Sequence, residues 1–415
     1  MTRVVAIRSQ IKTGGPKLDE RVSLFERRRH SVQEAMKGQG ISVIVAHGLS
    51  SYAGSGATGH GYVRYLTDWT SRFGASVIIQ PLKGLPTLIV PSAHDAQYIE
   101  ESFPWVERGL AESPPNYGAL VHKILTTLEP MIVGLVNQGD MPRRFYQDMV
   151  SDNEWQLTVA DDIIDRLRAN KDGHEIERHR TAARISDAMF VRLVETLEHY
   201  RGPAWKLMVE MEHAGREMGA EFATCWLGVG QPVDRCHYRI EELPQEIRKG
   251  DQVLAGTYVT YKGYWGHCIR MGAIGKPSDA YHRVYEAVRE QNRGAVAKIR
   301  VGADAREIQA EANLLAGTLL PGGAEHPARS RHAHFLGLDY ADKPTSSAFP
   351  QPSFWSQLPV PATQPVVLRP NMVLEVHTML GEKGGNYGFL GDVYLVRLDK
   401  PERLTQFPQE LFVID

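Results

Sequence analysis

The sequence predicts a two-domain protein of the mixed α/β (α+β) class. Its length of 415 residues is enough for two domains with sizeable cores. Short apolar strands alternate with helical segments in the first part of the chain, which is typical of an α/β domain. Farther on, long amphipathic helices flank an extended pair of strands. We therefore expect one domain over residues 1–165 and a second over residues 166–415.

The first domain is expected to open with an exposed amphipathic helix over residues 21–40. Apolar runs bounded by turn residues then predict strands, and segments with helical spacing predict helices between them. The expected strands are Ile41–Ala46, Tyr62–Trp69, Ser76–Pro81, Pro86–Pro91, Met131–Val136 and Gln156–Val159. The expected helices are Ala93–Glu101, Gly118–Leu128 and Pro142–Met149.

The second domain is expected to follow a linker at Asp161–Asp172, because a strongly periodic helix begins at Ile176. Its next feature is Lys249–Met271, which reads as two antiparallel strands that turn at residues 261–263, where Lys262 and Gly263 supply the turn. Further helices are predicted at Pro203–Gly219, Ala280–Ile299 and Ala303–Leu320.

Composition and hydropathy argue against several classes of partner and location. The formal net charge of -2, from 47 basic and 49 acidic residues, gives no general reason to bind nucleic acid or an anionic membrane. No apolar run is long enough for a signal peptide or a membrane span. Three cysteines without CxxC spacing favour a reducing compartment, and Cys268 is expected to pack in the core. We therefore expect a soluble cytoplasmic protein.

Four segments in a fixed order carry a resemblance to a known family. They are the hairpin at 249–271, then His332–Asp339 (HAHFLGLD), Asn371–His377 (NMVLEVH) and Gly388–Val393 (GFLGDV). Together they resemble the creatinase/aminopeptidase P/prolidase superfamily, the pita-bread fold. The resemblance implies a creatinase-like N-terminal domain, a pita-bread catalytic domain, a small-molecule substrate and a homodimer.

The resemblance also indicates where metal ligands would lie. In the metal-dependent members, two aspartates of the hairpin, one histidine and two glutamates bind two divalent metals. The corresponding positions in this sequence are Gly256, His267, His334, His377 and Gly391. One ligand of the family pattern, His334, is therefore kept, two positions have become histidine and two have become glycine. Asp392 lies next to Gly391, and on a strand it is expected to face elsewhere.

Three histidines at these positions predict a mononuclear site. Neutral imidazoles at His267, His334 and His377 form a sound ligand set for Fe, Zn or Mn and leave positions open for water or substrate. The two glycines remove the second metal and the bridging carboxylate. We therefore expect one divalent metal ion per chain and no organic cofactor.

Other candidate residues come from the same resemblance. His237, in the segment Arg235–Tyr238, matches the pocket histidine that acts as acid or base in creatinase, and an imidazole titrates near neutral pH. Arg72 and Phe73 fall in the stretch that reaches the substrate of the partner subunit in creatinase, although their order is altered. Ala341 replaces a further histidine of the family, which argues against the usual peptidase route.

Several functions are compatible with these residues. The first is a metal-dependent non-peptidase enzyme that hydrolyses a C–N bond of a small amino-acid-like molecule, with His237 as acid/base. A non-heme Fe(II) oxygenase or oxidase would use the same three histidines with dioxygen. The remaining alternatives are a metal-free creatinase-like hydrolase and a non-catalytic binding protein.

Overall fold

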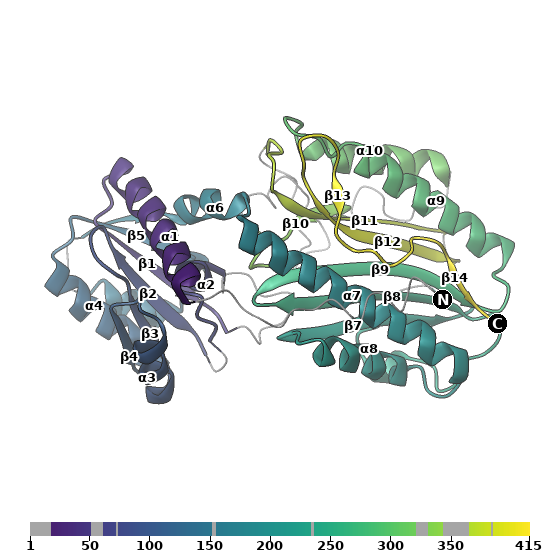
Figure 1. Ribbon diagram of the computed structural model, residues 1–415, viewed down its shortest axis with the longest axis horizontal. Coiled ribbons are helices and arrows are strands. Elements are labelled where there is room, and N and C mark those ends of the chain that lie inside the picture. The colour runs from purple at the N-terminus through teal and green to yellow at the C-terminus, as the bar shows by residue number, and fades with distance from the viewer. Residues whose placement is uncertain are drawn as a thin grey trace. The chain divides into compact units, whose positions relative to one another are not determined.

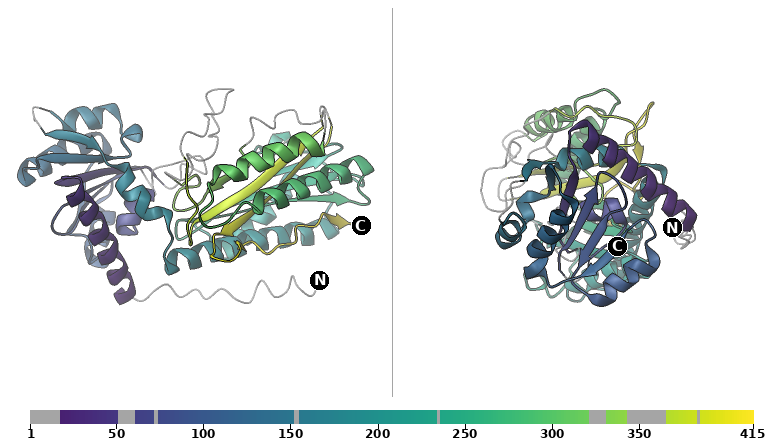
Figure 2. Two further views of the ribbon diagram at one scale, coloured as in Figure 1. Left: turned by 90° about the horizontal axis from the view of Figure 1, so that it is seen from above. Right: turned by 90° about the vertical axis from the view of Figure 1, so that its left-hand side faces the viewer.

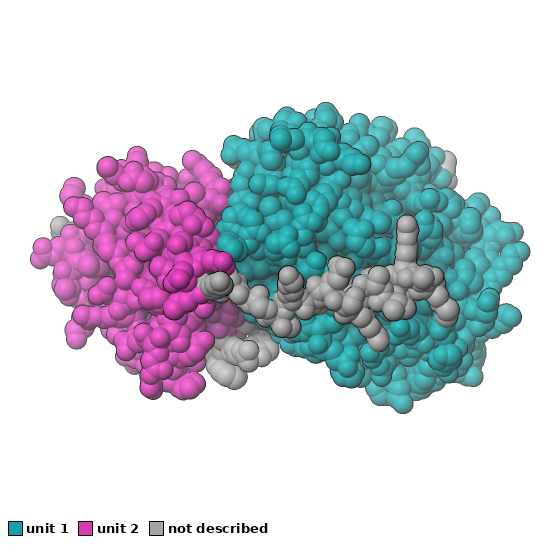
Figure 3. All heavy atoms as spheres, viewed as in Figure 1, with its two compact units in different colours: residues 1–12, 170–337, 341–415 teal, residues 13–169, 338–340 magenta. Residues whose placement is uncertain are grey.

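The computed structural model describes residues 18–50, 61–71, 74–151, 155–233, 236–320, 331–342, 365–382 and 385–415 (Figures 1 and 2). These residues form two compact units, coloured separately in Figure 3. Unit 2 contains the described residues up to Ala169 together with Leu338–Tyr340, and unit 1 contains Asn170–Gly337 and Ala341–Asp415. The domain boundary predicted between residues 165 and 166 stays a prediction.

Unit 2 is built on one mixed sheet. Its described strands form a 6-stranded sheet in the order β4-β3-β2-β1-β5-β6. They are β1 Val43–Gly48, β2 Ser76–Pro81, β3 Thr87–Val90, β4 Arg108–Ala111, β5 Ile132–Val136 and β6 Gln156–Val159. The helices are α1 Leu18–Gly38, α2 Gly61–Thr67, α3 Ala93–Ser102, α4 Tyr117–Leu128, α5 Arg143–Met149 and α6 Asp161–Ala169. The strands predicted at Ser76–Pro81 and Pro86–Pro91 are confirmed as β2 and β3, which pair antiparallel.

Two predictions in unit 2 are wrong. Residues 62–67, predicted as a strand, belong to the helix α2, and every residue of α2 is buried. A helix that is covered on all sides has no polar face, so its sequence lacks the periodicity that distinguishes it from a buried strand. The stretch from Asp161, predicted as a linker, begins with the helix α6, whose first turn is acidic and whose last turn is basic. That arrangement complements the helix dipole.

Unit 1 is built on a larger sheet. Its described strands form an 8-stranded sheet with the path β10-β11-β12-β9-β8-β7, while β13 pairs with β12 and β14 with β9. The strands are β7 Phe222–Gly230, β8 Gln252–Tyr261, β9 Tyr264–Ile274, β10 Ala333–Phe335, β11 Val373–Gly381, β12 Tyr387–Leu395, β13 Glu402–Arg403 and β14 Phe412–Ile414. The helices are α7 Gly173–His199, α8 Trp205–Glu217, α9 Asp279–Val296 and α10 Arg306–Leu319.

The hairpin of β8 and β9 has the predicted turn. Lys262 and Gly263, which lie between the two strands, both have positive φ angles of 47° and 83°. This backbone twist matches the twist of paired strands, and it favours glycine. The register of the hairpin places Tyr258 opposite His267 and Gly256 opposite Ile269. Local turn chemistry therefore fixes which residues of the two strands lie side by side.

Helices cover one face of the sheet in unit 1. The helix α7 begins with a capping box, in which the Asp172 carboxylate accepts from the Glu175 backbone N–H and the Glu175 side chain accepts from the Asp172 N–H. Apolar residues of α7 and α8 share a core with alternate residues of β8 and β9, and Cys268 lies in that core, as predicted. Figure 2 shows α9 beside α10, with α9 over β11 and β12. None of the described helices combines the length and the apolarity that a membrane crossing requires.

Candidate metal centre

Three strands of unit 1 bring four polar side chains together. His267 lies on β9, His334 on β10, and Glu375 and His377 on β11. His334 is directly opposite Glu375 in the pairing of β10 with β11. Successive side chains on a strand alternate between faces, so Glu375 and His377 point to the same side of the sheet. The strand register therefore brings one carboxylate and three imidazoles together, and all four side chains are buried.

The Glu375 carboxylate lies between two of the imidazoles. One of its oxygens, Oε2, is 2.9 Å from His334 Nε2, and the other, Oε1, contacts His267 Nδ1. One donor atom each from His334, Glu375 and His377 lie within 4.8 Å of one another. Neither ring nitrogen of His377 has a hydrogen-bond partner in the part of the chain that the structure describes. A buried imidazole of this kind is a candidate ligand, since buried polar atoms normally have partners.

The charges at this site favour metal binding. Burial by itself would raise the pKa of Glu375, but the charges of His267 and His377 and the hydrogen bonds to His267 and His334 outweigh it and hold that pKa well below its usual range. Burial lowers the pKa of His377 well below its usual value, and it also lowers the pKa of His334. Metal coordination requires a charged carboxylate and neutral imidazoles, and the lowered pKa values of Glu375, His334 and His377 favour these forms. Nitrogen and carboxylate donors together suit divalent first-row transition metals.

Glu375 is the residue that comparison by motif alone missed. The family pattern places a ligand at the position of His377, and Glu375 stands two residues earlier on the same strand. The period of two along a strand is the signal that could have found it, because it puts residues 375 and 377 on one face. Of the predicted ligands, His334 and His377 join Glu375 in one cluster, and His267 contacts the carboxylate of Glu375.

The positions of the two glycines are filled by other side chains. A Cβ atom added to Gly256 would lie 2.3 Å from carbon atoms of the Trp226 indole, which comes from β7 directly opposite. A Cβ atom at Gly391 would lie 3.1 Å from Glu375 Oε1 and 3.1 Å from His377 Cβ. The indole thus occupies the space of a side chain at 256, and the Glu375 carboxylate faces the space left by the glycine at 391.

Aromatic side chains form a wall beside the centre. The Trp226 ring stacks on Phe389 at a centroid distance of 5.6 Å, and Phe389 meets the His377 ring at 5.5 Å. On the other side, Tyr258 packs against the His267 ring at 4.6 Å. The Tyr258 hydroxyl lies 3.3 Å from the hydroxyl of Tyr238, whose side chain reaches solvent. Aromatic rings therefore pack against His377 and His267, with phenolic hydroxyls as nearby polar groups.

The remaining predicted site residues have different placements. His237 pairs with Leu227 through the backbone, and its Nδ1 lies 3.3 Å from Glu242 Oε2. No hydrogen bond or ion pair joins His237 to the four ligating candidates in the described chain. Its neighbour Tyr238 points toward Tyr258 instead, as expected for adjacent residues of extended chain. Arg72 and Phe73 lie outside the described residues.

Asp392 faces away from the centre, as predicted. It forms a fully buried ion pair with Arg270, with 2.6 Å between Arg270 Nη2 and Asp392 Oδ1. Ala341 follows Tyr340 in the sequence, and no histidine stands there.

Comparison with known proteins identifies the family. Residues 177–398, more than half of the chain, match metallopeptidase family M24. The chain belongs to metallopeptidase family M24. The probable dipeptidase PepE of Mycobacterium tuberculosis is 25% identical over 257 residues, which are 62% of this chain and 64% of PepE. The uncharacterized peptidase YqhT of Bacillus subtilis is 23% identical over 365 residues, which are 85% of this chain and 93% of YqhT.

Solved structures of M24-like proteins share the fold. The Xaa-Pro dipeptidase from Bacillus anthracis matches with a TM-score of 0.73 at 20% identity, over 94% of this chain and 100% of that one. The prolidase from Pyrococcus horikoshii OT3 matches with a TM-score of 0.73 at 18% identity, over 93% of this chain and 99% of that one. The match to family M24 confirms the predicted resemblance to the creatinase/aminopeptidase P superfamily. The solved structures confirm the predicted α/β architecture, with its pita-bread fold and two-domain layout.

Proposed function

We propose that this M24 protein is a single-metal hydrolase that acts on a C–N bond of a small amino-acid-like molecule. In this proposal His267, His334, Glu375 and His377 hold one divalent ion. The observation that carries it is the buried convergence of three imidazoles on one carboxylate, with donor atoms of three of these residues within 4.8 Å of one another.

The donor set supports hydrolytic chemistry. Two histidines and one glutamate are the ligands of well-known zinc hydrolases, and His334, Glu375 and His377 provide that combination. A divalent ion bound there would act as a Lewis acid that polarises a carbonyl group and lowers the pKa of water. The M24 relatives named above as dipeptidases also cleave a C–N bond, which supports this reaction class.

The filling of the glycine positions supports a single ion. The Trp226 indole packs directly on Gly256, so no side chain can extend from that residue toward a second ion. Glycine at 391 likewise offers no bridging carboxylate. We therefore propose a substrate other than the peptides that a two-metal site hydrolyses.

The side chains around the ligands have separate tasks in the proposal. The rings of Phe389 and Tyr258 pack against the imidazoles of His377 and His267 and hold them in place. The hydroxyl of Tyr238, a residue that is largely exposed, can donate to a polar group of the substrate. His237 remains the proposed acid/base residue, and the contact of its Nδ1 with the Glu242 carboxylate orients the ring. Arg72 and Phe73 remain predicted substrate contacts.

A second candidate function is supported by the same residues. His334, Glu375 and His377 form a set of two histidines and one carboxylate, which is typical of non-heme Fe(II) oxygenases. In this alternative the bound ion is iron and the second substrate is dioxygen. The homodimer, the cytoplasmic location and the lack of an organic cofactor also stay predictions.

Metal analysis tests both functions. Protein purified without a metal-chelating tag is analysed by plasma mass spectrometry, beside His334→Ala, His377→Ala and the control His282→Ala on the outer helix α9. We expect one ion per chain in the parent and the control, and loss of the ion in the other two variants. Zinc or manganese together with amine release from N-acyl amino acids supports hydrolysis, whereas iron with substrate-dependent oxygen uptake supports the alternative. A parent that binds no ion even after reconstitution would overturn both proposals.

A further inference from the structure

The metal centre lies across a junction in the sheet of unit 1. His267 is on β9, Glu375 and His377 are on β11, and β12 runs between these two strands. β9 pairs with β8 along the whole of β8, and β11 pairs with β12 along its whole length. In the described chain, however, Gly391 opposite Ile269 is the single register pair that connects β12 to β9. We call this connection the β9–β12 junction.

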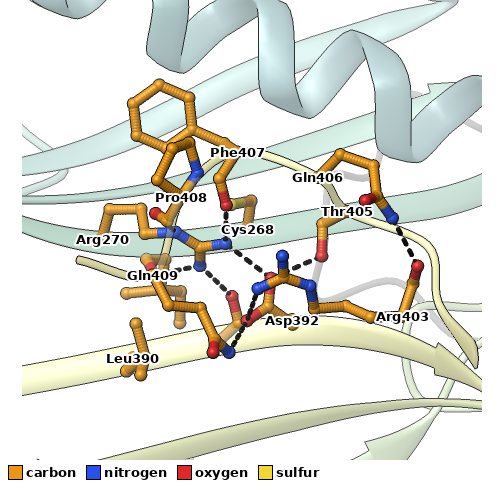
Figure 4. Close-up of polar contacts among 12 residues, drawn as sticks. Cys268, Arg270, Leu390, Asp392, Arg403, Thr405, Gln406, Phe407, Pro408 and Gln409 are labelled. Atoms are coloured by element: carbon orange, nitrogen blue, oxygen red, sulfur yellow. Dashed lines mark hydrogen bonds and ion pairs between the residues drawn. The ribbon is translucent and has the colours of Figure 1, made fainter. Parts of the chain in front are cut away.

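Arg270 reinforces this junction from the other face of the sheet (Figure 4). Its guanidinium Nη1 donates to the carbonyl oxygens of Ile269 and Gly391, at 2.8 Å each. These are the two residues of the single register pair. Arg270 Nη2 donates to Asp392 Oδ1 at 2.6 Å, so one side chain of β9 binds both a carbonyl and a carboxylate of β12.

A C-terminal segment completes the arrangement. Arg270 Nε donates to the carbonyl oxygen of Pro408 at 2.6 Å, and Nη2 donates to that of Phe407 at 2.7 Å. Asp392 in turn accepts from the Thr405 hydroxyl and from the Gln409 amide, at 2.6 Å each. Every N–H of the guanidinium is thus used, and both members of the pair are completely buried.

The placement of Arg270 relates this network to the metal centre. Side chains alternate along β9, so His267 and Ile269 face the centre while Cys268 and Arg270 face the helices. On β12, Gly391 is directly opposite His377 of β11. The backbone carbonyls of Ile269 and Gly391, which Arg270 joins, therefore lie close to the proposed ligands His267 and His377.

We propose that Arg270 is a positioning residue that clamps β9 to β12 and so sets the separation of His267 from Glu375 and His377. Its consequence for metal affinity rests on the proposed function, whereas the clamp itself does not. Partners that orient metal ligands typically change metal affinity by about 10- to 100-fold when they are removed. We expect an effect of that size for Arg270, although the residue does not touch the centre.

The test uses the full chain and a variant designed to fold. Arg270→Met alone would leave the buried Asp392 carboxylate with Arg403, 4.0 Å away, as its nearest cation. It is therefore combined with Asp392→Leu, which replaces the Arg270–Asp392 pair by apolar groups. The control is Arg168→Met with Asp339→Leu, which removes another buried Arg–Asp pair with the same 2.6 Å separation, in unit 2. Circular dichroism and size-exclusion chromatography verify that both double variants are folded.

Two measurements are made on these proteins. Hydrogen exchange by mass spectrometry follows peptides covering residues 264–274 and 387–395, without added metal. Calorimetric titration with Zn²⁺ gives the dissociation constant. We expect faster exchange in both peptides and about 10- to 100-fold weaker zinc binding for Arg270→Met/Asp392→Leu, with neither change in the control. Arg270→Lys keeps the charge but has fewer donors. We expect its exchange rates and its zinc affinity to lie between those of the parent and those of Arg270→Met/Asp392→Leu.

The outcomes separate this inference from the proposed function. Unchanged exchange in a folded Arg270→Met/Asp392→Leu variant would overturn the clamp, and faster exchange with unchanged zinc affinity would overturn its positioning role. If the parent binds no metal, the proposed function fails. In that case the exchange measurement alone decides whether Arg270 holds the β9–β12 junction.

Discussion

At the scale of single residues, Glu375 is a buried carboxylate in contact with imidazoles of two other strands. Its carboxylate is buried, contacts His267 and lies 2.9 Å from His334. The motif comparison assigned residue 377 and passed over residue 375, because the family pattern carries no ligand there. The role of Glu375 depends on the histidines that β9 and β10 place beside it. The sequence of its own strand therefore does not mark it as a ligand. The three histidines, in contrast, were predictable because each stands at a ligand position of a recognisable motif.

The Glu375→Gln substitution tests the role of this carboxylate. The amide keeps the size of the side chain but removes the negative charge, so Zn²⁺ or Fe²⁺ binding should weaken by about 100-fold or more, beyond the effect of losing an outer partner. Calorimetric titration with each ion measures the change. Glu382→Gln, just beyond the end of β11, makes the same chemical change away from the ligands and should leave the affinity unaltered. Equal affinities of the two variants would remove Glu375 from the ligand set.

At the scale of elements, the structure separates what local sequence determines from what it does not. The β8–β9 hairpin was predictable because Lys262 and Gly263 determine the turn by their own backbone preferences. The strand β7 was not predicted, and with it the contact of Trp226 with Gly256. That contact depends on the register of two strands separated by a long connection, which the sequence of neither strand specifies.

The packing of β9 against α7 gives a stability prediction. A Cβ atom on Gly266 would lie 2.5 Å from the carbonyl carbon of Ala182, and the backbone of α7 cannot move aside as a flexible side chain can. We expect Gly266→Ala to lower the free energy of unfolding by roughly 1–3 kcal/mol, as overpacking usually does. Urea denaturation measures this loss.

The control for that measurement is another glycine of the same unit. A Cβ atom on Gly173, the first residue of α7, would meet nothing within 4 Å. Gly173→Ala should therefore leave the urea midpoint unchanged or raise it slightly, because alanine restricts the unfolded chain. A Gly266→Ala protein as stable as Gly173→Ala would show that the strand and the helix are not in contact at this point.

At the scale of the whole molecule, stability should depend on pH through Asp187. This residue of α7 is buried, and its carboxylate accepts from the backbone N–H groups of Gln406 and Phe407. Burial raises its pKa from 3.8 to about 7, against the opposing effect of these hydrogen bonds. An acid with a higher pKa in the folded state takes up a proton on folding between the two pKa values. The free energy of unfolding should therefore fall as the pH rises from about 4 to about 7.

The comparison with Asp187→Asn isolates this contribution. Over that pH range the parent should lose up to about 1.4 kcal/mol for each pH unit relative to the variant, which has no titrating group at this position. Urea denaturation at a series of pH values gives the difference. A constant difference between the two proteins from pH 4 to pH 7 would show that Asp187 does not titrate there.

The contact of Trp226 with Gly256 constrains the order in which this sequence can change. An aspartate at 256 would collide with an indole that is itself buried and stacked on Phe389, so that substitution cannot come first. A smaller residue at 226 would have to precede it, and truncating a buried tryptophan leaves a cavity that costs about 3–5 kcal/mol. Either first step is harmful alone, and only the pair of changes is compatible with packing. Trp226, on a neighbouring strand, therefore prevents a single substitution from placing an aspartate at residue 256.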